Sequence, residues 1–576
     1  MSTVPQILTD LVAAAADAAG YADSPVPLEP AQASNNPTHG DYQSNYAFRL
    51  GKSMKLNPRA VAQTIADAMP AHPAVAAVEV AGPGFLNFRL SEAWLGQQLA
   101  AQCAEPTFGL TPREGTVVID YSSPNVAKRM HVGHLRSTVI GNALDRMHRF
   151  AGYDVVADNH IGDWGTQFGK LIVAWDRWVD EAAFKADPIA ELQRIYQQFS
   201  REAKEDASLN DLARAETVKL QAGDERNRSL WRRFVDESLV EFQAVYDRFG
   251  IQFDETLGES AYHDALGPMV DDLLASGVAE VSDGAVIIPF EPGDGKGLGK
   301  NPLLIRKRDG AFLYGTTDMA TVRYRLDTWD PVRIIVVTDL RQQLHFRQFF
   351  TASRKLGWVE KGRLQHVWFG MLTLPEGGIA STREGEVINL VDLLDESVAK
   401  ARAVVEASSP DLSEEEKAHV AEQVGVGAVR YADLSQNPQS NIGFTWEKMM
   451  AMDGNTAPFM MYAYARSRSI FRKGDIDPAS LDLAAIRPEH EAERALVTAL
   501  LRFPEIVEAA LGAYRPNMIC EYLYNTAREF NRFYQACPVL SSEGATRESR
   551  LALIEASGRV LKAGMGLVGL TALERM

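Results

Sequence analysis

The 576-residue sequence predicts an α/β protein, in which a parallel sheet lies between a small α+β region and a helical region. Two strand–helix–strand patterns predict this sheet. The first joins the strand TVVIDYS (116–122), the amphipathic run HLRSTVIGNALDRMHRFAG and the strand YDVVADNHIGD. The second joins VRIIVVTDL (332–340), HFRQFFTASRKLG and LQHVWFGML. Strands connected through a helix run parallel, so we expect a Rossmann-type, doubly wound sheet split by a large insertion.

The other regions follow from their own patterns. Residues 1–110 end in VAAVEVAGPGFLNFRLSEAW, which predicts two strands about a Gly-Pro-Gly turn and then a helix. The sheet is expected over 111–390, with a charged, helix-rich insertion at about 171–300. A connecting helical region over 391–453 and a helical domain over 454–576 follow, because most of this part has helical periodicity.

Composition restricts the class of protein. No apolar run has the length needed to span a bilayer, and the N-terminal stretch lacks the basic segment of a signal peptide. The three cysteines (Cys103, Cys520 and Cys537) lack CxxC spacing, which favours a reducing, cytoplasmic location and disfavours a thiolate zinc site. A net charge of -17 disfavours indiscriminate nucleic-acid binding, so neither DNA nor a membrane is an expected partner. An RNA bound through local basic faces stays open.

The segment His131-Val132-Gly133-His134 is the strongest candidate for chemistry. It follows the first strand and opens a helix, where ligands of an open parallel sheet bind. A helix N-terminus offers free N–H groups and a partial positive charge, which suit a phosphate. Two imidazoles can stabilise charge that grows on a phosphate, Gly133 allows close approach of a ligand, and Lys128 adds a full charge. A nucleotide site is therefore predicted here.

Other interpretations of these histidines are possible. HxxH occurs as a zinc pair, but no third ligand has a familiar spacing, and no metal site is predicted. A single histidine is also often a packing residue.

Several segments resemble one family in order and spacing. SPNVAKRMHVGHLRSTVIGNAL resembles the HIGH-motif region of class I aminoacyl-tRNA synthetases, specifically arginyl-tRNA synthetases. FDETLGESAY, LYGTTDMATVRYR, VVTDLRQQLHFRQ, VGVGAVRYADLS, DGNTAPFMMYAYAR and the terminal LERM are similar to the same family, so the resemblance runs from about residue 80 to the end. It implies an ATP-dependent ligase that joins L-arginine to tRNA(Arg) through an arginyl-adenylate, with Mg2+, and we expect a monomer.

The resemblance also implies an arginine site. Glu259 and Asp318 match the positions that hold the guanidinium, Tyr314 and Gln342 match its other side-chain contacts, and Asn125 matches the residue that holds the amino-acid head. A planar cation with five donors calls for carboxylates arranged as a fork, which agrees with this assignment. By composition alone, each carboxylate would be a solvated surface charge.

The second class I signature, a lysine-rich KMSKS loop, is missing. After FGMLTLPEGG the chain continues IASTREGEVINL, where Ser381 stands in place of a first lysine and Arg383 is the remaining cation. Arginyl-tRNA synthetases often have a degenerate loop here. The resemblance implies that Lys128 supplies the missing charge to the α-phosphate, and it places Ser381 and Arg383 among the ATP-binding residues with His131, Gly133 and His134.

Two regions are expected to contact tRNA. GPGFLNFRLS resembles the module that binds the D-loop, which makes Phe85 and Asn87 candidates for base contacts. The C-terminal domain resembles the anticodon-binding bundle. There APFMMYAYARSR would present Tyr462, Arg466 and Arg468, while Met461 replaces a glutamine common in the family. Aromatic side chains at these spacings also occur in protein cores.

The leading prediction is therefore an arginine–tRNA ligase that charges the 2′-hydroxyl of the terminal adenosine, with activation that depends on tRNA. Two alternatives are a catalytically inactive, synthetase-like RNA-binding protein and a small adenylyltransferase with an HxGH site. The altered KMSKS region is the support for the first. The second does not require a helical C-terminal domain or paired carboxylates.

Overall fold

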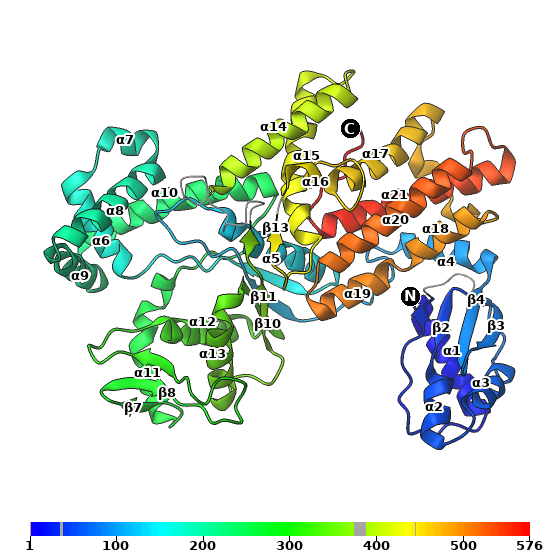
Figure 1. Cartoon of the computed structure of the whole chain (residues 1–576), viewed down its shortest axis with the longest axis horizontal. Helices are drawn as coiled ribbons and strands as arrows, with labels where there is room; N and C mark the ends of the chain where they lie inside the picture. The colour runs from blue at the N-terminus through cyan, green and yellow to red at the C-terminus, as the bar shows by residue number, and fades with distance from the viewer. Residues whose placement is uncertain (1, 35–38, 374–387, 444) are drawn as a thin grey trace. The chain divides into compact units, whose positions relative to one another are not determined.

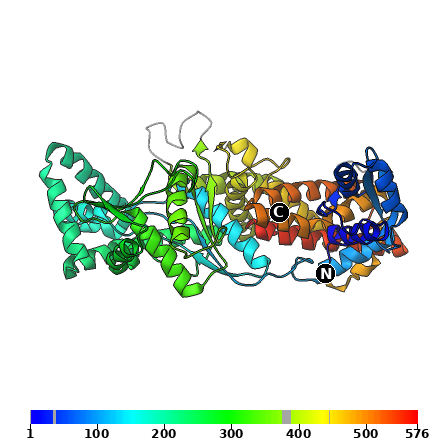
Figure 2. The same ribbon diagram turned by 90° about the horizontal axis from the view of Figure 1, so that it is seen from below.

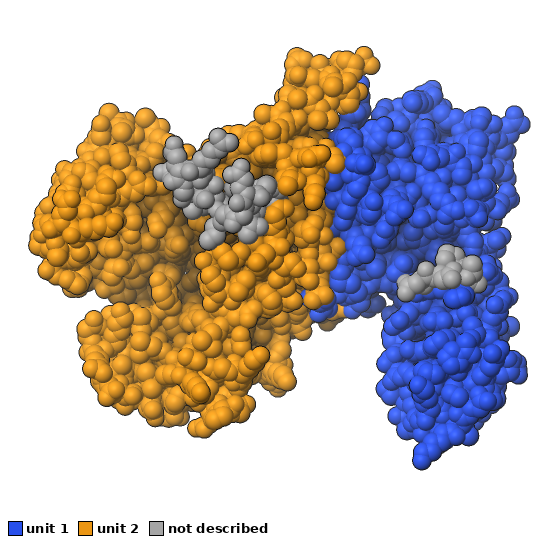
Figure 3. Space-filling view, viewed as in Figure 1, with its two compact units in different colours: residues 1–112, 452–513, 518–576 blue, residues 113–451, 514–517 orange. Residues whose placement is uncertain are grey.

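The computed structural model (Figure 1) describes residues 2–34, 39–373, 388–443 and 445–576, and these form two compact units (Figure 3). Unit 1 comprises residues 1–112, 452–513 and 518–576, so it contains both ends of the chain. Unit 2 comprises residues 113–451 and 514–517.

Unit 2 is organised around a four-stranded sheet in the order β11-β10-β5-β6. The strands are β5 (Thr116–Asp120), β6 (Asp154–Asp158), β10 (Arg333–Asp339) and β11 (Leu364–Phe369). All three pairings are parallel, which confirms the predicted sheet. The chain builds outward from β5 to β6 and later from β10 to β11 on the other side. The topological switch point, where ligands of such sheets bind, is therefore at the carboxyl ends of β5 and β10.

Helices α5 (Val132–Phe150), α12 (Tyr314–Trp329) and α13 (Gln343–Lys355) connect or cover this sheet. Ile119 of β5, Leu135 of α5 and Ile334 of β10 are fully buried, as expected for strands and helices that are apolar toward a common core. Arg136 of α5 is also buried. It donates to the Asp433 carboxylate (3.0 Å) and to the carbonyl of Gly370 (2.7 Å).

The long segment between β6 and β10 contains the region, about 171–300, that was expected as an insertion. Its first part is helical and packs as one bundle (Figure 1 and Figure 2). These helices are α6 (Thr166–Trp178), α7 (Glu181–Ala186), α8 (Pro188–Glu205), α9 (Ser208–Gln221) and α10 (Glu225–Phe249). Its second part comprises η2 (Glu259–Tyr262), α11 (His263–Ala275) and a small antiparallel sheet of β7 (Glu280–Ser282), β8 (Ala285–Ile288) and β9 (Leu303–Arg306).

After the sheet, unit 2 ends in helices that pack against α5. They are α14 (Leu390–Ser408) and α15 (Glu414–Leu434), and α16 (Trp446–Met449) packs against α15. The short strands β12 (Leu372–Thr373) and β13 (Ile442–Gly443) pair in parallel beside them, and η3 (Leu340–Gln342) lies between β10 and α13.

Unit 1 contains an antiparallel sheet and a helical bundle. The sheet has the order β1-β2-β4-β3, with β1 (Gln32–Ala33), β2 (Tyr42–Ser44), β3 (Val75–Ala81) and β4 (Phe85–Leu90). The helices beside it are α1 (Val4–Ala18), α2 (Tyr46–Met54) and α3 (Pro58–Asp67), and α4 (Glu92–Ala104) packs against the bundle. The bundle comprises α17 (Ala457–Gly474), η4 (Pro478–Ser480), η5 (Leu483–Ala485), α18 (Glu491–Leu501), α19 (Phe503–Ala513), α20 (Asn517–Ala536) and α21 (Gly544–Leu567). The predicted strand–turn–strand of residues 75–90 and the helical C-terminal region are therefore confirmed.

Over the described residues, no helix combines the length and the apolar character needed to cross a bilayer.

Candidate active site

The N-terminus of α5 places two imidazoles side by side. His131 is the N-cap residue, and its Nδ1 accepts from the N–H of Gly133 (3.0 Å). His134 Nδ1 accepts from the N–H of His131 (3.1 Å), and the ring centroids are 4.1 Å apart. Because each Nδ1 is an acceptor, each neutral ring carries its proton on Nε2. The pair therefore offers two Nε2–H donors beside the positive end of a 19-residue helix.

Both rings are held in the neutral form. Burial and then the charge of Lys128 lower the pKa of His131. Burial, and next the neighbouring His131, lower the pKa of His134 to about 3. A neutral imidazole donates a hydrogen bond but carries no net charge. The full positive charge predicted for this site is therefore that of Lys128. The Lys128 side chain is exposed, and its Nζ lies 5.4 Å from the centre of the Tyr196 ring.

The loop between β5 and α5 has an unusual backbone. Ser122, Ser123 and Ala127 have φ values of 70°, 50° and 61°, in the left-handed region that non-glycine residues rarely adopt. Side chains from other elements hold this conformation. Ser137 Oγ accepts from the N–H of Ser122 (3.0 Å), and Ser238 Oγ accepts from the N–H of Ala127 (2.8 Å). Strain of this kind is maintained where the surrounding structure fixes it, and it gathers at functional sites.

Ser381 and Arg383, which are predicted to bind ATP, lie outside the described residues. The chain that follows them returns to the histidines. Val132 donates to the carbonyl of Ile388 (3.0 Å), and Leu390 donates to that of Met130 (2.9 Å). The described chain after residue 387 thus starts in contact with the N-terminus of α5.

Carboxylates gather at the predicted arginine site. Glu259 begins η2, and burial together with the nearby charges of Asp318 and Asp163 raises its pKa to about 7. Asp318, on α12, hydrogen-bonds through Oδ2 with Nε2 of His345 from α13. Two like charges that raise a neighbour's pKa create a negative potential, which a cationic ligand would relieve.

The other predicted arginine contacts lie around these carboxylates. Tyr314 is the first residue of α12, is 73% exposed, and shares a helix face with Asp318 four residues on. Gln342 is exposed at the end of η3, three residues before His345. Asn125 is exposed and pairs with Gly162, where a Cβ would lie 2.2 Å from the Asn125 Oδ1. Asn125 therefore needs a glycine as its neighbour.

Sequence reasoning missed three residues of this region. Arg325 of α12 is buried between Asp120 and Asp158, with 2.6 Å and 2.7 Å ion pairs to their carboxylates, and it joins the carboxyl ends of β5 and β6. The others are His345, beside Asp318, and Asp163, whose carboxylate accepts from Ser260. No local pattern marks any of them, because their partners lie 27 to 205 residues away.

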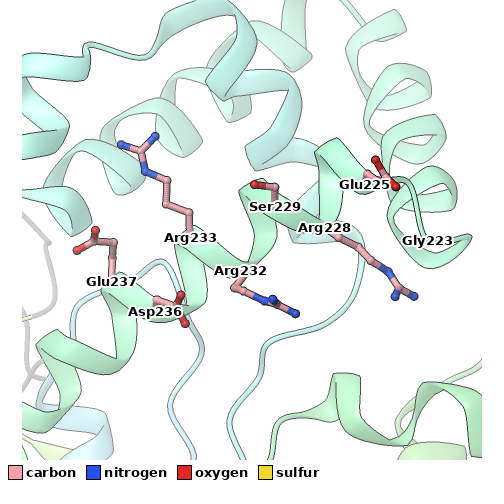
Figure 4. Close-up of a pocket in the computed structure, with 8 residues that line it drawn as sticks. All are labelled: Gly223, Glu225, Arg228, Ser229, Arg232, Arg233, Asp236 and Glu237. Atoms are coloured by element: carbon pink, nitrogen blue, oxygen red, sulfur yellow. The ribbon is translucent and has the colours of Figure 1, made fainter.

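A surface groove of unit 2 runs along α10 (Figure 4) and has a volume of about 580 Å³. Its walls carry three arginines and three carboxylates, so it has no net charge and gives no electrostatic reason to bind phosphate. It is lined by Gly223, Glu225, Arg228, Ser229, Arg232, Arg233, Asp236 and Glu237.

The predicted tRNA contacts of the C-terminal domain separate into two groups. Arg466 lies 4.7 Å from the centre of the Tyr462 ring and 5.7 Å from that of Tyr534, in an open cavity of about 440 Å³. Arg468 instead points into the bundle, where it pairs with buried Glu555 (2.8 Å). The bundle therefore encloses most of the Arg468 side chain, and its contact with RNA stays a prediction.

The N-terminal candidates differ in exposure. Phe85 is half-buried and lies 5.5 Å from Phe48, ring centre to ring centre. Asn87 is only 4% exposed, and its Oδ1 accepts from Nε2 of Gln43 on β2 (2.8 Å). Of this pair of amides, Gln43 is the more exposed.

Three family descriptions match the chain. "tRNA synthetases class I (R), catalytic domain" matches residues 103–446, "DALR anticodon binding domain" matches 460–576, and "Arginyl tRNA synthetase N terminal domain" matches 6–90.

Relatives of the same kind match along the whole chain. An "Arginine--tRNA ligase" of Fusobacterium nucleatum is 46% identical over 94% of both chains, and one of Laribacter hongkongensis is 42% identical over 100% of both. Among solved structures, arginyl-tRNA synthetase from Plasmodium falciparum covers 100% of both chains with a TM-score of 0.84 and 26% identity. The Thermus thermophilus arginyl-tRNA synthetase, at 24% identity, supports the fold alone, with a TM-score of 0.83 over 100% of both chains. The histidine pair, the carboxylate cluster and these matches lead to one conclusion: the chain belongs to the arginyl-tRNA synthetase family of class I aminoacyl-tRNA synthetases.

Proposed function

We propose that this chain is an arginine–tRNA ligase. It activates L-arginine with ATP to arginyl-adenylate and transfers the arginyl group to the 2′-hydroxyl of the terminal adenosine of tRNA(Arg), releasing pyrophosphate and AMP. The observation that carries the proposal is the negative cluster at Glu259 and Asp318 in a chain whose α5 N-terminus presents two Nε2–H donors. The first feature suits a guanidinium, and the second suits a phosphate.

The activation step requires groups that stabilise negative charge on the phosphate, and it uses no protein nucleophile. The arginine carboxylate attacks the α-phosphorus, and negative charge grows on the phosphate oxygens as pyrophosphate leaves. His131 and His134 donate to these oxygens, and Lys128 adds a full positive charge. Glu259, Asp318, Tyr314 and Gln342 hold the side chain of arginine, and Asn125 holds its head.

Mg2+ is expected to arrive with ATP, where it neutralises phosphate charge. In the part of the chain that the structure describes, no group of three or more His, Cys, Asp or Glu side chains could hold a metal ion. Mg2+ is commonly bound through substrate phosphates and one or two carboxylates.

The tRNA contacts follow the domain matches. The anticodon-binding domain offers the cavity of Tyr462 and Arg466, where an aromatic ring and a cation can both engage a base. In the N-terminal domain, Phe85 is the candidate for stacking on a base, and Asn87 is hydrogen-bonded to Gln43. We further propose that activation depends on tRNA and that the protein acts as a cytoplasmic monomer.

ATP–pyrophosphate exchange tests the proposal. It is run with arginine or lysine, each with and without total tRNA. Exchange that needs both arginine and tRNA is the expected result. Exchange with arginine alone would remove the tRNA requirement but keep the ligase. No exchange under any condition, with tRNA binding intact, would contradict the proposal and favour a non-catalytic RNA-binding protein.

A further inference from the structure

Asp163, in the loop after β6, lies close to Glu259 of the predicted arginine site. Its side chain is only 4% exposed, and it takes no part in the proposed activation step. Its Oδ1 accepts from the N–H of Ser260 (2.9 Å), and its Oδ2 accepts from the Ser260 hydroxyl (2.6 Å). A buried carboxylate with both oxygens bound to one residue fixes that residue firmly.

These bonds control the backbone of Glu259, the neighbour of Ser260. The N–H of Glu259 donates to the carbonyl of Ile161 (3.1 Å), so the consecutive N–H groups of residues 259 and 260 are both bound by the 161–163 loop. The carbonyl of Asp163 is itself anchored, since Nε1 of Trp231 on α10 donates to it (2.7 Å). The start of η2 is therefore clamped to the loop that follows β6.

Gly258 shows how closely the two segments approach. Its φ is -83°, so the backbone conformation does not require glycine. A Cβ at this position would nevertheless lie 2.1 Å from Cγ of Asp163 and 2.2 Å from both carboxylate oxygens. Any side chain at position 258 would therefore displace the Asp163 carboxylate from its hydrogen bonds with Ser260.

Asp163 also acts through its charge. The charges of Asp318 and Asp163 act on Glu259. Asp318 from α12 is paired with His345 from α13, and His160 acts on Asp163. No lysine or arginine among the described residues forms an ion pair with Asp163 or Glu259. Three carboxylates therefore influence one another electrostatically, and Asp163 and Glu259 have no lysine or arginine partner among the described residues.

We propose that Asp163 is a positioning residue of the guanidinium site, which fixes Glu259 through Ser260 and adds a third negative charge that favours a cationic side chain. This inference rests on the proposed function, because the cation is the substrate. Asp163 acts on arginine through Glu259 and by its potential, while its oxygens remain occupied by Ser260.

The test measures the arginine KM and kcat of aminoacylation between pH 5.5 and 8.5. In the wild-type enzyme, KM is expected to rise as the pH falls below about 7, since Glu259 must be ionised to bind the guanidinium and its pKa is about 7. Asp163→Asn keeps the shape and an acceptor for Ser260 but removes the charge. At pH 8 we expect KM to rise about 10- to 100-fold, because a negative charge near the guanidinium is lost and the hydrogen bonding to Ser260 is no longer charge-assisted, with kcat changed much less.

The pH profile separates the electrostatic role from simple packing. Removing a like charge lowers the pKa of Glu259, so the break in KM should move to lower pH in Asp163→Asn. Ser260→Ala keeps the charge of Asp163 and should raise KM without moving the break downward. Asp236→Asn, on the exposed face of α10, is the matched control and should change neither quantity.

Several results would overturn the inference. One is an arginine KM that is unchanged in Asp163→Asn. Another is a raised KM whose pH dependence breaks at the same pH as in the wild type, which would mean that Asp163 contributes through packing alone. If Asp163→Asn fails to fold by circular dichroism, an unchanged KM in Ser260→Ala would overturn it instead. A wild-type protein that does not charge tRNA with arginine would contradict the proposed function, so the two failures are distinguishable.

Discussion

Asp318 joins the predicted guanidinium site to α13 through His345, and its charge helps to raise the pKa of Glu259. Asp318→Asn should therefore leave a bound guanidinium without one of its carboxylates. Loss of one partner of a buried ion pair costs about 3–5 kcal/mol, and the partial exposure of Asp318 favours the lower end. We expect the arginine KM to rise by about 100-fold in aminoacylation assays.

A control for this variant lies on the same helix. Asp327→Asn removes an exposed carboxylate of α12 that pairs with Arg323 (2.9 Å) at the surface, and surface pairs contribute little. Its KM should match that of the wild type. A near-normal KM in Asp318→Asn would show that the guanidinium is held elsewhere.

Lys128 is the residue whose charge should matter most for the chemical step. Both imidazoles have lowered pKa values, so they approach the phosphate uncharged. Lys128→Ala should slow ATP–pyrophosphate exchange about 100-fold, as expected for loss of one donor to a developing oxyanion, with the arginine KM little changed. Lys204→Ala, at an exposed position of α8, should have no effect. An exchange rate in Lys128→Ala equal to that of wild type would remove Lys128 from the ATP site.

At this scale, the sequence could predict residues that lie within one short segment. His131, Gly133 and His134 occupy a single turn after a strand, and that context alone indicated a phosphate site. Asp163 is one of 76 acidic residues, and nothing adjacent distinguishes it. Its role depends on Ser260, 97 positions away, and on the absence of a side chain at Gly258.

Elements were easier to predict than their ends. The strands of both βαβ units were expected because their apolar runs are continuous, and the structure has β5, β6, β10 and β11 at those places. Helix α5 begins at Val132, three residues before Leu135, because His131 caps it. Histidine is an uncommon N-cap, so the usual Ser, Thr, Asp and Asn signals did not mark this start.

The packing of α5 on the end of β5 depends on Gly141. A Cβ at Gly141 would lie 2.2 to 2.7 Å from atoms of the buried Tyr121 side chain, which follows β5 directly. Gly141→Ala should therefore force the helix away from the strand and lower the stability of unit 2 by about 1–3 kcal/mol, the usual cost of overpacking. Thermal unfolding monitored by circular dichroism should show a lower transition temperature, and exchange activity should fall because the histidines are on the same helix.

Gly512→Ala provides the matched comparison. Gly512 is exposed within α19, and nothing lies within 4 Å of a Cβ built there. Alanine has the better helix propensity, so stability should rise slightly, by less than about 1 kcal/mol. A Gly141→Ala protein as stable as this control would show that Tyr121 can move aside at little cost.

At the scale of the molecule, unit 1 is assembled from both ends of the chain. Its N-terminal sheet is tied to the C-terminal bundle by contacts that span more than 400 positions. Arg494 pairs with Asp41 (2.6 Å), and the hydroxyl of Tyr42 donates to Glu505 (2.7 Å). Sequence patterns predicted each part separately, because periodicity reports which face of an element is buried and not which distant segment covers it.

Glu505 makes this assembly sensitive to pH. Burial raises its pKa to about 7, while the unfolded chain would have the ordinary value near 4.5. The folded state therefore retains a proton that the unfolded state loses as the pH rises between these values, so the stability of unit 1 falls across that window and stays lower above pH 7. Glu505→Gln keeps an acceptor for Tyr42 but cannot ionise, and it should stabilise unit 1 at pH 8 by about 1–3 kcal/mol.

Hydrogen exchange of β2 and α19, corrected for the intrinsic rate, measures this effect in unit 1 separately from unit 2. Protection in the wild type should be greater at pH 6 than at pH 8, and the difference should largely disappear in Glu505→Gln. Glu521→Gln, an exposed position of α20, should retain the wild-type pH dependence. If Glu505→Gln were less protected than wild type at pH 8, the ionised carboxylate would be a stabilising partner of Tyr42, and the contact would tighten as the pH rises.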